Sequence, residues 1–485
     1  MPSRRGIALA GISLAGTAAG LLGQVFLFRR FGATAELDLY FYSLAVPTFL
    51  AGQFALVMGY YLVPFLSREV REIERPRFQR HLLAMLCVLG LLASMPGIVA
   101  GALLAPDLPM QGGSSELVVV VTLSALAWPS VIVGNASAAM ASFLNVRSAF
   151  VLPALFPLIS QVGMLLALVL SPDTGVMTPL IGLNAGGLLA CALGWMALRE
   201  PAHGPDTADI ASHWTEVWTF FRRAGFLPLV LSIFSAHFFV DALLASQLPA
   251  GELSTLALAH RVNIGAVGVV VAAFASPMTA ELSAAAEEPA RFRELLLCSL
   301  RRLFVYGAAV ATTIHLNADF IAHMLVGFGK SSSGAAAPLA DLIRAVAIAG
   351  LPMLIAQFLL RAMLASHLHR LSVLAACTWA VVYLPGAVLL APRAGATGLA
   401  FTYLAAWSVF CLFCLSSTRT LSLLRPASVA TALGIVLLYS AATLGARLGF
   451  RFALGDAPAA ALLTVGVGAT VSALLALAID RRPAR

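Results

Sequence analysis

The sequence has few charged residues and almost no lysine. Only 11% of its 485 residues are charged, 60% are hydrophobic, and Lys330 is the single lysine. Soluble domains have about a quarter of their residues charged, so this composition excludes an ordinary soluble protein. The net charge of +8 does not indicate nucleic-acid binding, because the basic residues lie between apolar stretches and not on one face of a soluble domain.

Residues typical of metal and nucleotide sites are also scarce. Six cysteines lie in or beside apolar stretches, and Cys411 and Cys414 form a lone C-x-x-C within one of them. A structural zinc site takes about four ligands, so we expect no metal. The glycines before Lys330 lack the spacing of a phosphate-binding loop, and we see no paired acids on a sizeable loop. We therefore expect no enzyme and no resident cofactor.

Long apolar stretches fill the remaining sequence, and the mean hydropathy is +0.93. A helix of roughly 18 or more apolar residues can cross a hydrocarbon core of about 30 Å, and spans in lipid must satisfy their own backbone groups. The sequence thus predicts an all-α polytopic membrane protein with about fourteen transmembrane helices. Their expected positions are 7–28, 37–66, 82–105, 117–143, 148–170, 176–198, 218–244, 254–281, 299–325, 339–363, 370–391, 396–417, 427–446 and 457–479.

The distribution of arginine predicts the topology. If the N-terminus is cytoplasmic, about 22 basic residues fall on the cytoplasmic side and about six on the other, which agrees with the positive-inside rule. Both termini and the loop 198–217 are then cytoplasmic. The first apolar run, Ile7 to Phe28, is long enough to be an uncleaved helix and not a signal peptide.

A polar linker with Pro, Gly, Asp and His, residues 198–214, separates the first six spans from the next six. We predict an N-lobe over 1–200, a C-lobe over 201–420 and two further helices over 421–485. The stretch that joins spans 1 and 2 faintly resembles the one that joins spans 7 and 8, as in a duplicated transporter whose site lies between the repeats.

The stretch "FRRFGATAELDLYFY" (28–42) places charges between two apolar spans. Arg29 and Arg30 either snorkel at a helix end or bind a pyrophosphate through their planar guanidinium groups. Asp38 is either an acid favoured by the dipole at the start of its own helix or a gate that pairs with a basic residue of the other lobe.

Other polar residues lie deeper in the predicted spans. Arg261 lies about 10 Å into its span, where a charge is expected to face a cavity, and Asn263 is close to it in sequence. Arg344 faces either the cavity or a contact between lobes. His237 and Asp241 are four residues apart and share a helix face, so they either form a structural pair or relay a proton or hold a cation.

Several stretches in this order resemble the MurJ/MviN family of lipid II flippases, within the multidrug/oligosaccharidyl-lipid/polysaccharide exporter superfamily. The resemblance covers about residues 5 to 420. It implies two six-helix lobes around a central cavity, a groove for lipid tails formed by the last two helices, and a bacterial inner membrane location. The stretches are "FRRFGATAELDLYFYSLAVPTFL" (28–50), 134–161, 240–283, "LVGFGK" (325–330) and 358–373.

The chain also departs from the family pattern. The family has an arginine in helix 1 where this chain has Gly23 or Gln24, and another in helix 2 where it has "FLAGQFALVM" (49–58). The resemblance also implies a sodium site, to which Asp241 and Thr402 correspond, but helix 11 offers no Asn or Asp for it. Coupling to sodium or to protons therefore stays open.

We conclude from the sequence that the chain is a flippase for an undecaprenyl-pyrophosphate-linked, lipid II-like glycan, working by alternating access. We expect Arg29, Arg30, Asp38, Arg261, Asn263 and Arg344 to contact the substrate, and His237, Asp241 and Thr402 to couple an ion. The alternatives are an exporter of another lipid-linked oligosaccharide, a drug or cation antiporter, and a scaffold without transport. Membrane lipids are the other expected partners, and the oligomeric state is undetermined.

Overall fold

The computed structural model describes two compact units, residues 1–254 and 255–485. Every element in the described part is a helix, and no strand occurs there, which confirms the all-α class. The described residues are 4–464 except 59–61, 63–64, 67–74, 104–115, 148, 172–174, 200–209, 226, 272–277, 279–280, 283–284, 286–287, 327–334, 367, 418–435, 438 and 449–463.

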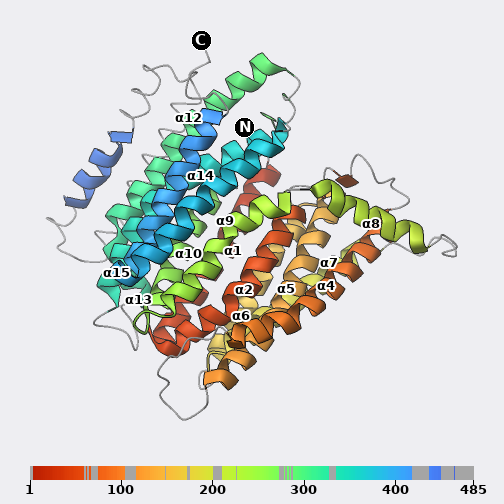
Figure 1. Cartoon of the computed structure of the whole chain (residues 1–485), viewed down its shortest axis with the longest axis horizontal. Coiled ribbons are helices and arrows are strands. Elements are labelled where there is room, and N and C mark those ends of the chain that lie inside the picture. Colours follow the sequence, from red (N-terminus) through yellow and green to blue (C-terminus); the bar gives the residue numbers. More distant parts are fainter. Residues whose placement is uncertain are drawn as a thin grey trace. The chain divides into compact units, whose positions relative to one another are not determined.

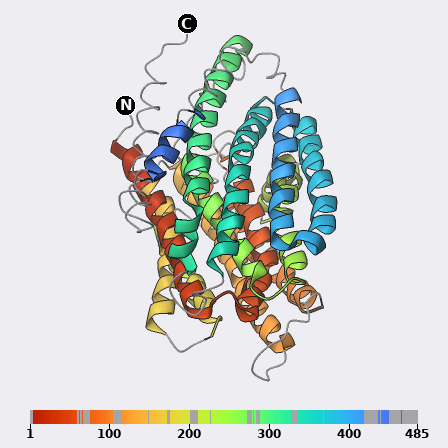
Figure 2. The same ribbon diagram turned by 90° about the vertical axis from the view of Figure 1, so that its left-hand side faces the viewer.

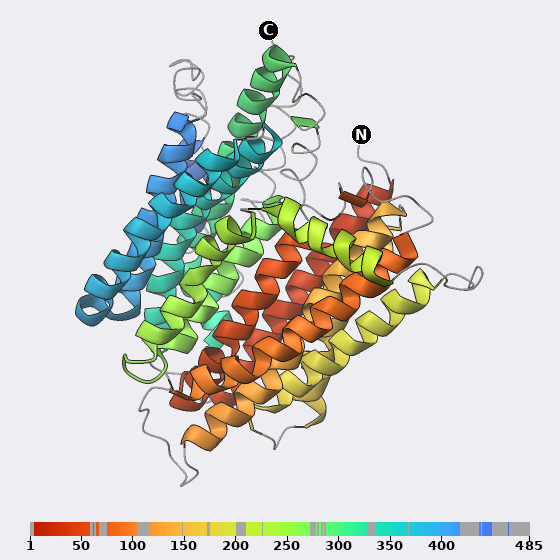
Figure 3. The ribbon, with the colours of Figure 1, turned by 45° about the vertical axis from the view of Figure 1, so that its right-hand side comes forward.

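Unit 1 is a bundle of long helices with one shorter helix across their ends (Figures 1 and 3). Within it α1 packs on α6, α6 on α7, and α2 on α5 and α9. The helices of this unit are α1 (Arg4–Phe31), α2 (Ala35–Val57), α4 (Arg75–Leu103), α5 (Glu116–Val146), α6 (Val151–Leu170), α7 (Thr178–Leu198), α8 (Ile210–Ala224) and α9 (Leu227–Ala245), and the next helix, α10 (Glu252–Val270), begins here.

Helices α6 and α7 approach each other through glycine. Gly182 and Gly186 are four residues apart on α7 and face α6. A Cβ at Gly186 would lie 2.7 Å from the carbonyl oxygen of Ile159, and one at Gly163 would lie 2.5 Å from the carbonyl oxygen of Gly182. Small residues four apart allow helix backbones to touch within a membrane, where packing replaces the hydrophobic effect as the driving force.

Unit 2 contains α12 (Pro289–Leu316), α13 (Ala318–Val326), α14 (Ala336–Ala365) and α15 (His369–Ser417). Helix α14 packs against α12, α13 and α15, and Figure 2 shows α12, α14 and α15 running side by side. α15 has non-helical torsion angles at Gly395, φ 59° and ψ −148°. Its two arms correspond to the predicted spans 370–391 and 396–417. A further helical stretch, 439–448, belongs to this unit.

Three boundaries predicted from the sequence were wrong. The predicted loop 198–217 is helical from Ile210 onward, and the predicted span 218–244 is broken at Gly225, whose φ is 56°. The predicted span 299–325 ends at Leu316, after which Asn317 caps the helix and donates through Nδ2 to the carbonyl oxygen of Thr313 at 2.8 Å. Apolar residues resume soon after each break, so hydropathy averaged over a window does not register it.

Seven helices in the described part are long and apolar enough to cross a membrane. They confirm a membrane-embedded, multi-pass chain. They extend over Phe78–Val99, Val118–Val146, Val151–Leu170, Thr178–Leu198, Pro289–Leu316, Ala336–Leu364 and Arg370–Ser417. Most of the predicted spans 427–446 and 457–479 lies outside the described residues.

Candidate functional site: buried polar groups and helix-end contacts

The turn between α1 and α2 docks against the turn that precedes α10. Gly32 and Gly251 both have positive φ, 75° and 94°, which glycine adopts without a steric penalty. A Cβ on Gly251 would lie 2.7 Å from the carbonyl oxygen of Ala33. Glycine is therefore required at residue 251 both for its torsion angle and for the close approach of the two turns.

Asp38 fastens these turns together. Its Oδ2 accepts a hydrogen bond from the backbone N–H of Gly251 at 2.6 Å, and its Oδ1 accepts one from the N–H of Ser254 at 2.7 Å. The side chain is 1% exposed. Gly251 has no side chain with which to cap α10, so a carboxylate more than 200 residues away satisfies the free N–H groups at the helix start.

These partners add to the sequence-based interpretations of Asp38, which does lie in the first turn of its own helix. The aspartate acts at the start of α10 and not only at the start of its own helix, and its hydrogen-bond acceptors meet backbone N–H groups instead of a basic side chain. Gly251 and Ser254 were not predicted from the sequence as partners of Asp38. The available signal was the glycine immediately before a helix start, which leaves that helix without a side-chain cap.

The two neighbouring arginines at the end of α1 differ in environment. Arg30 is partly buried, donates from Nη1 to the carbonyl oxygen of Ser171 at 2.8 Å, and its guanidinium carbon lies 5.0 Å from the ring centre of Phe31. Ser171 is the C-terminal cap of α6, where a positive charge is favoured by the helix dipole. Arg29 is exposed. Arg30 therefore has a structural role at the end of α6.

At the position of the family arginine, α1 packs closely on α6. A Cβ at Gly23 would lie 2.0 Å from Cε of Met164 on α6, so no larger side chain fits without rearrangement. Its neighbour Gln24 is 1% exposed, and its Oε1 has no hydrogen-bond partner among the described residues. Burying an amide oxygen without a hydrogen bond costs free energy of folding. Gln24 is a further buried polar group of this kind inside unit 1.

In unit 2, α10 carries a buried polar stretch. His260 is 3% exposed and contacts the Tyr403 ring edge-on, with 4.6 Å between ring centres. Asn263 is 2% exposed, and its Nδ2 has no hydrogen-bond partner in the described part of the chain. Gly350 on α14 leaves space for the Asn263 Oδ1, which would lie 2.5 Å from a Cβ there. Arg261 lies between these residues and is half-buried.

Arg344 belongs to an ionic cluster. It donates to Asp341 at 2.6 Å and to Asp319 on α13, and Arg447 also donates to Asp319, at 3.1 Å. Partial burial acts to raise the pKa of Asp319, but the two arginines outweigh it and the pKa is lowered. The sequence analysis did not identify Asp319 and Arg447, because they come from segments far apart in the chain.

The predicted ion-coupling residues are all buried. On α9, His237 is 4% exposed and Asp241 5% exposed. Nδ1 of His237 lies 2.7 Å from the carbonyl oxygen of Phe234, to which it donates. Thr402 in unit 2 is 3% exposed and donates its hydroxyl to the carbonyl oxygen of Gly398 at 2.9 Å. The described part of the chain contains no group of three or more His, Cys, Asp and Glu placed to hold a metal ion.

Unit 1 also contains an apolar pocket of about 200 Å³ between α2, α4, α5 and α9. Ser43 supplies one of its few polar groups, and Oγ of Ser43 has no hydrogen-bond partner among the described residues. Pro47 on α2 also lines it and lacks the N–H that would bond the Ser43 carbonyl. The lining residues include Tyr42, Val46, Phe49, Gly97, Ser124, Trp128 and Phe239.

Multiple apolar helices with buried polar and ionisable groups define a polytopic membrane protein of the transporter class. Ionisable groups inside the membrane are expensive, and they commonly mark transport pathways. The profile of the family described as "Lipid II flippase MurJ" matches residues 27–459. The chain belongs to this family, which is a family of transporters and not of enzymes.

The solved structures show the same fold. A structure described as "Lipid II flippase MurJ, inward closed conformation" is similar at a TM-score of 0.80 and 19% identity, over 98% of this chain and 99% of that one. An inward-facing multidrug resistance MATE transporter of the MOP superfamily is similar at a TM-score of 0.66 and 12% identity, over 87% and 94%. A MOP superfamily transporter from Pyrococcus furiosus reaches 0.63 at 12% identity, over 86% and 95%. Comparison with curated protein sequences gives no match.

Proposed function

We propose that this protein flips a lipid-linked glycan with a pyrophosphate headgroup across the bacterial inner membrane by alternating access. The observation that carries the proposal is the family match over residues 27–459. A lipid II-like molecule has a polar headgroup that cannot cross hydrocarbon unaided, and a tail that can stay in the bilayer. A helical protein with polar groups buried between its spans suits this task.

The proposed architecture has fourteen spans. Residues 1–200 form an N-lobe and residues 201–420 a C-lobe, with the cavity between them, and residues 421–485 add two helices with a groove for the lipid tail. The family match and the arginine bias support this arrangement. Both termini are cytoplasmic in this proposal, and the α1–α2 turn lies on the periplasmic side.

In this topology Asp38 helps to close the periplasmic side. The carboxylate holds two turns together through N–H groups that would otherwise be buried and unpaired. Opening toward the periplasm has to break or relocate these bonds, so the Asp38 cap stabilises the closed state. The same residue is available to the headgroup only after the turns separate.

Arg29 and Arg261 are the leading candidates for pyrophosphate contacts. Arg29 is exposed and Arg261 is half-buried between buried polar residues. Asn263 is a third candidate, since its Nδ2 is a buried donor without a partner in the described part of the chain. A substrate that binds Arg30 or Arg344 must compete with the protein oxygens to which these two side chains donate.

The ion-coupling proposal rests on His237, Asp241 and Thr402. A buried acid and imidazole on one helix face are suited to proton transfer or to help hold a cation. The Thr402 hydroxyl donates a hydrogen bond to the carbonyl oxygen of Gly398, so its oxygen lone pairs remain available to a cation. Transport under a proton gradient, a sodium gradient or neither would distinguish these routes.

The test is flipping of a fluorescent lipid-linked glycan in proteoliposomes, with complementation of a strain depleted of its lipid II flippase as the cellular counterpart. Loss of one charge-assisted bond, about 1.5–3 kcal/mol, should weaken headgroup binding by about 10- to 100-fold in Arg261→Ala and Arg29→Ala. Arg261→Lys should recover only part of the activity, because an ammonium cannot make the forked contact.

The outcome separates the alternatives. Activity on another lipid-linked oligosaccharide but not on lipid II would indicate the wider exporter function, and ion-coupled export of cationic drugs would indicate an antiporter. A folded protein that moves none of these substrates would indicate a scaffold. Full activity of Arg261→Ala would show that this arginine is structural.

A further inference from the structure

Helix α8 has one buried and one exposed face. Val217 and Phe220 are fully buried and Ala224 is 6% exposed, and their spacing of three and four residues places them on one side of the helix. Thr215, Trp218 and Arg222 are exposed on the opposite side, and the indole of Trp218 is 67% exposed. Arg80 belongs to α4, but we include it with these three residues under one name, the outer face of α8.

Aromatic packing sets the depth of this helix relative to a membrane span. The Phe220 ring lies 5.3 Å from that of Phe65 and 6.3 Å from that of Phe78, both in edge-on contact. Phe78 is the first residue of the candidate span Phe78–Val99. α8 therefore packs against the first residue of this candidate span, and we infer that it lies where α4 enters the bilayer.

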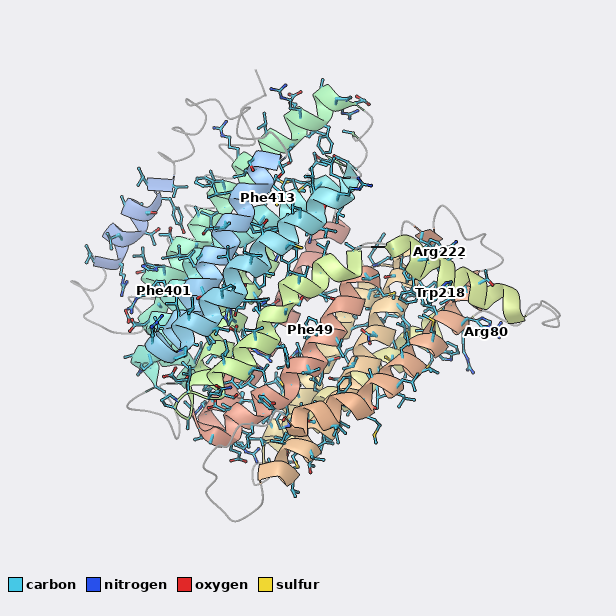
Figure 4. The ribbon with its side chains drawn as sticks, in the orientation of Figure 1. Phe49, Arg80, Trp218, Arg222, Phe401 and Phe413 are labelled. Atoms are coloured by element: carbon cyan, nitrogen blue, oxygen red, sulfur yellow. The ribbon has the colours of Figure 1, made fainter. Side chains whose placement is uncertain are left out.

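The outer face combines an exposed indole with guanidinium groups at that depth. Trp218 and Arg222 are four residues apart on α8, and Arg80 is an exposed residue in the first turn of the α4 span. Figure 4 shows Trp218, Arg222 and Arg80 at the same end of unit 1. An exposed indole is unfavourable in water, but Trp is enriched at the headgroup level of membranes, where its ring is amphipathic.

We propose that the outer face of α8 binds the headgroups of anionic phospholipids. The indole would lie among the upper acyl chains and glycerol groups, and the guanidinium groups of Arg222 and Arg80 would donate to phosphate oxygens, for which Arg is geometrically suited. Amphipathic helices with Trp on one side and arginine nearby associate with anionic interfaces in this way. The depth fixed by Phe78 favours a lipid over a soluble protein partner.

The arginine bias places α8 on the cytoplasmic side, where bacterial anionic lipids would meet it. Since α8 joins the end of one set of spans to α9, lipid binding here would anchor the connection while the transmembrane helices move. The consequence is a lipid requirement that is separate from recognition of the transported molecule.

The test uses the full-length protein in phosphatidylcholine vesicles that contain either brominated phosphatidylcholine or brominated phosphatidylglycerol. The fluorescence of Trp218 is obtained by subtracting the spectrum of Trp218→Phe from that of the unmodified protein. We expect stronger quenching of this component by brominated phosphatidylglycerol than by brominated phosphatidylcholine, and a smaller difference at high salt. No flipping is measured, so this result is independent of the proposed transport function.

Arg222→Gln should lower the preference for phosphatidylglycerol about fivefold, which corresponds to about 1 kcal/mol for one basic residue at the surface. Arg222→Lys should keep most of it. Arg291→Gln is the matched control, because Arg291 is an exposed arginine on α12 and its loss should change nothing.

Equal quenching by the two brominated lipids, or an unchanged preference in Arg222→Gln combined with Arg80→Gln, would overturn the proposal. So would quenching of Trp218 by acrylamide alone, because the outer face would then lie in water and be open to a protein partner.

Discussion

Replacing Asp38 by alanine should open the contact between the α1–α2 turn and the start of α10. The substitution removes hydrogen bonds of 2.6 and 2.7 Å and leaves the N–H groups of Gly251 and Ser254 without their acceptor. The carboxylate is 1% exposed, so water does not readily replace it.

The expected cost follows from the number and kind of these bonds. A hydrogen bond to a charged acceptor contributes about 1.5–3 kcal/mol, and the loss of a helix cap costs up to about 2 kcal/mol. Relaxation of the turn recovers part of the loss, so we expect about 2–4 kcal/mol. If this whole free energy is lost from the closed arrangement and none from the arrangement with separated turns, the population with separated turns rises by about 30- to 1,000-fold.

Accessibility of a cysteine at residue 254 measures this population. Ser254 is fully buried, and Ser254→Cys retains the backbone N–H that bonds Asp38. In a background without the native cysteines, labelling by a membrane-impermeant thiol reagent should be slow and should accelerate on Asp38→Ala. Asp38→Asn should give an intermediate rate, because its amide keeps one acceptor oxygen.

Glu36→Ala is the matched control, since Glu36 is an exposed acid in the first turn of the same helix. It should leave the labelling rate unchanged. A folded Asp38→Ala protein with the labelling rate of the parent would refute the reasoning, because the cap would then not be what holds the two turns together.

Three further predictions concern packing and charge. Gly186→Leu should destabilise unit 1 strongly in thermal unfolding in detergent, because even a Cβ there meets the Ile159 carbonyl oxygen at 2.7 Å, whereas Gly445→Ala, with open space around it, should be tolerated. Gly251→Ala should accelerate labelling at residue 254 as Asp38→Ala does, because φ is 94° and Ala33 leaves no space. The pKa of Asp319 is lowered in the folded protein, so its ion pairs contribute their full stabilisation at pH values above the ordinary pKa of an aspartate. This contribution is lost as the pH falls through the lower pKa of the folded state. Asp319→Asn should remove that acid-side dependence, which unfolding followed across acidic pH would detect.

Local properties of the sequence determined the class of this protein. The sparse charge and repeated apolar stretches predict a polytopic helical membrane protein, and hydropathy located spans such as 370–391 and 396–417, which form the two arms of α15. Hydropathy is a sum over neighbouring residues, so it locates apolar segments well. It does not locate a short break after which apolar residues resume, which is why the helix end at Leu316 and the turn at Gly225 were missed.

The partners of the charged residues were decided only by the tertiary structure. Arg29 and Arg30 are adjacent and equivalent in the sequence, yet Arg30 donates to the end of α6 while Arg29 is exposed. An aspartate near a helix start has the same sequence pattern whether it caps its own helix or another one, and Asp38 caps α10. A hydrogen bond depends on groups that meet within about 3 Å, and for these residues the meeting groups come from segments that the chain brings together only when it folds.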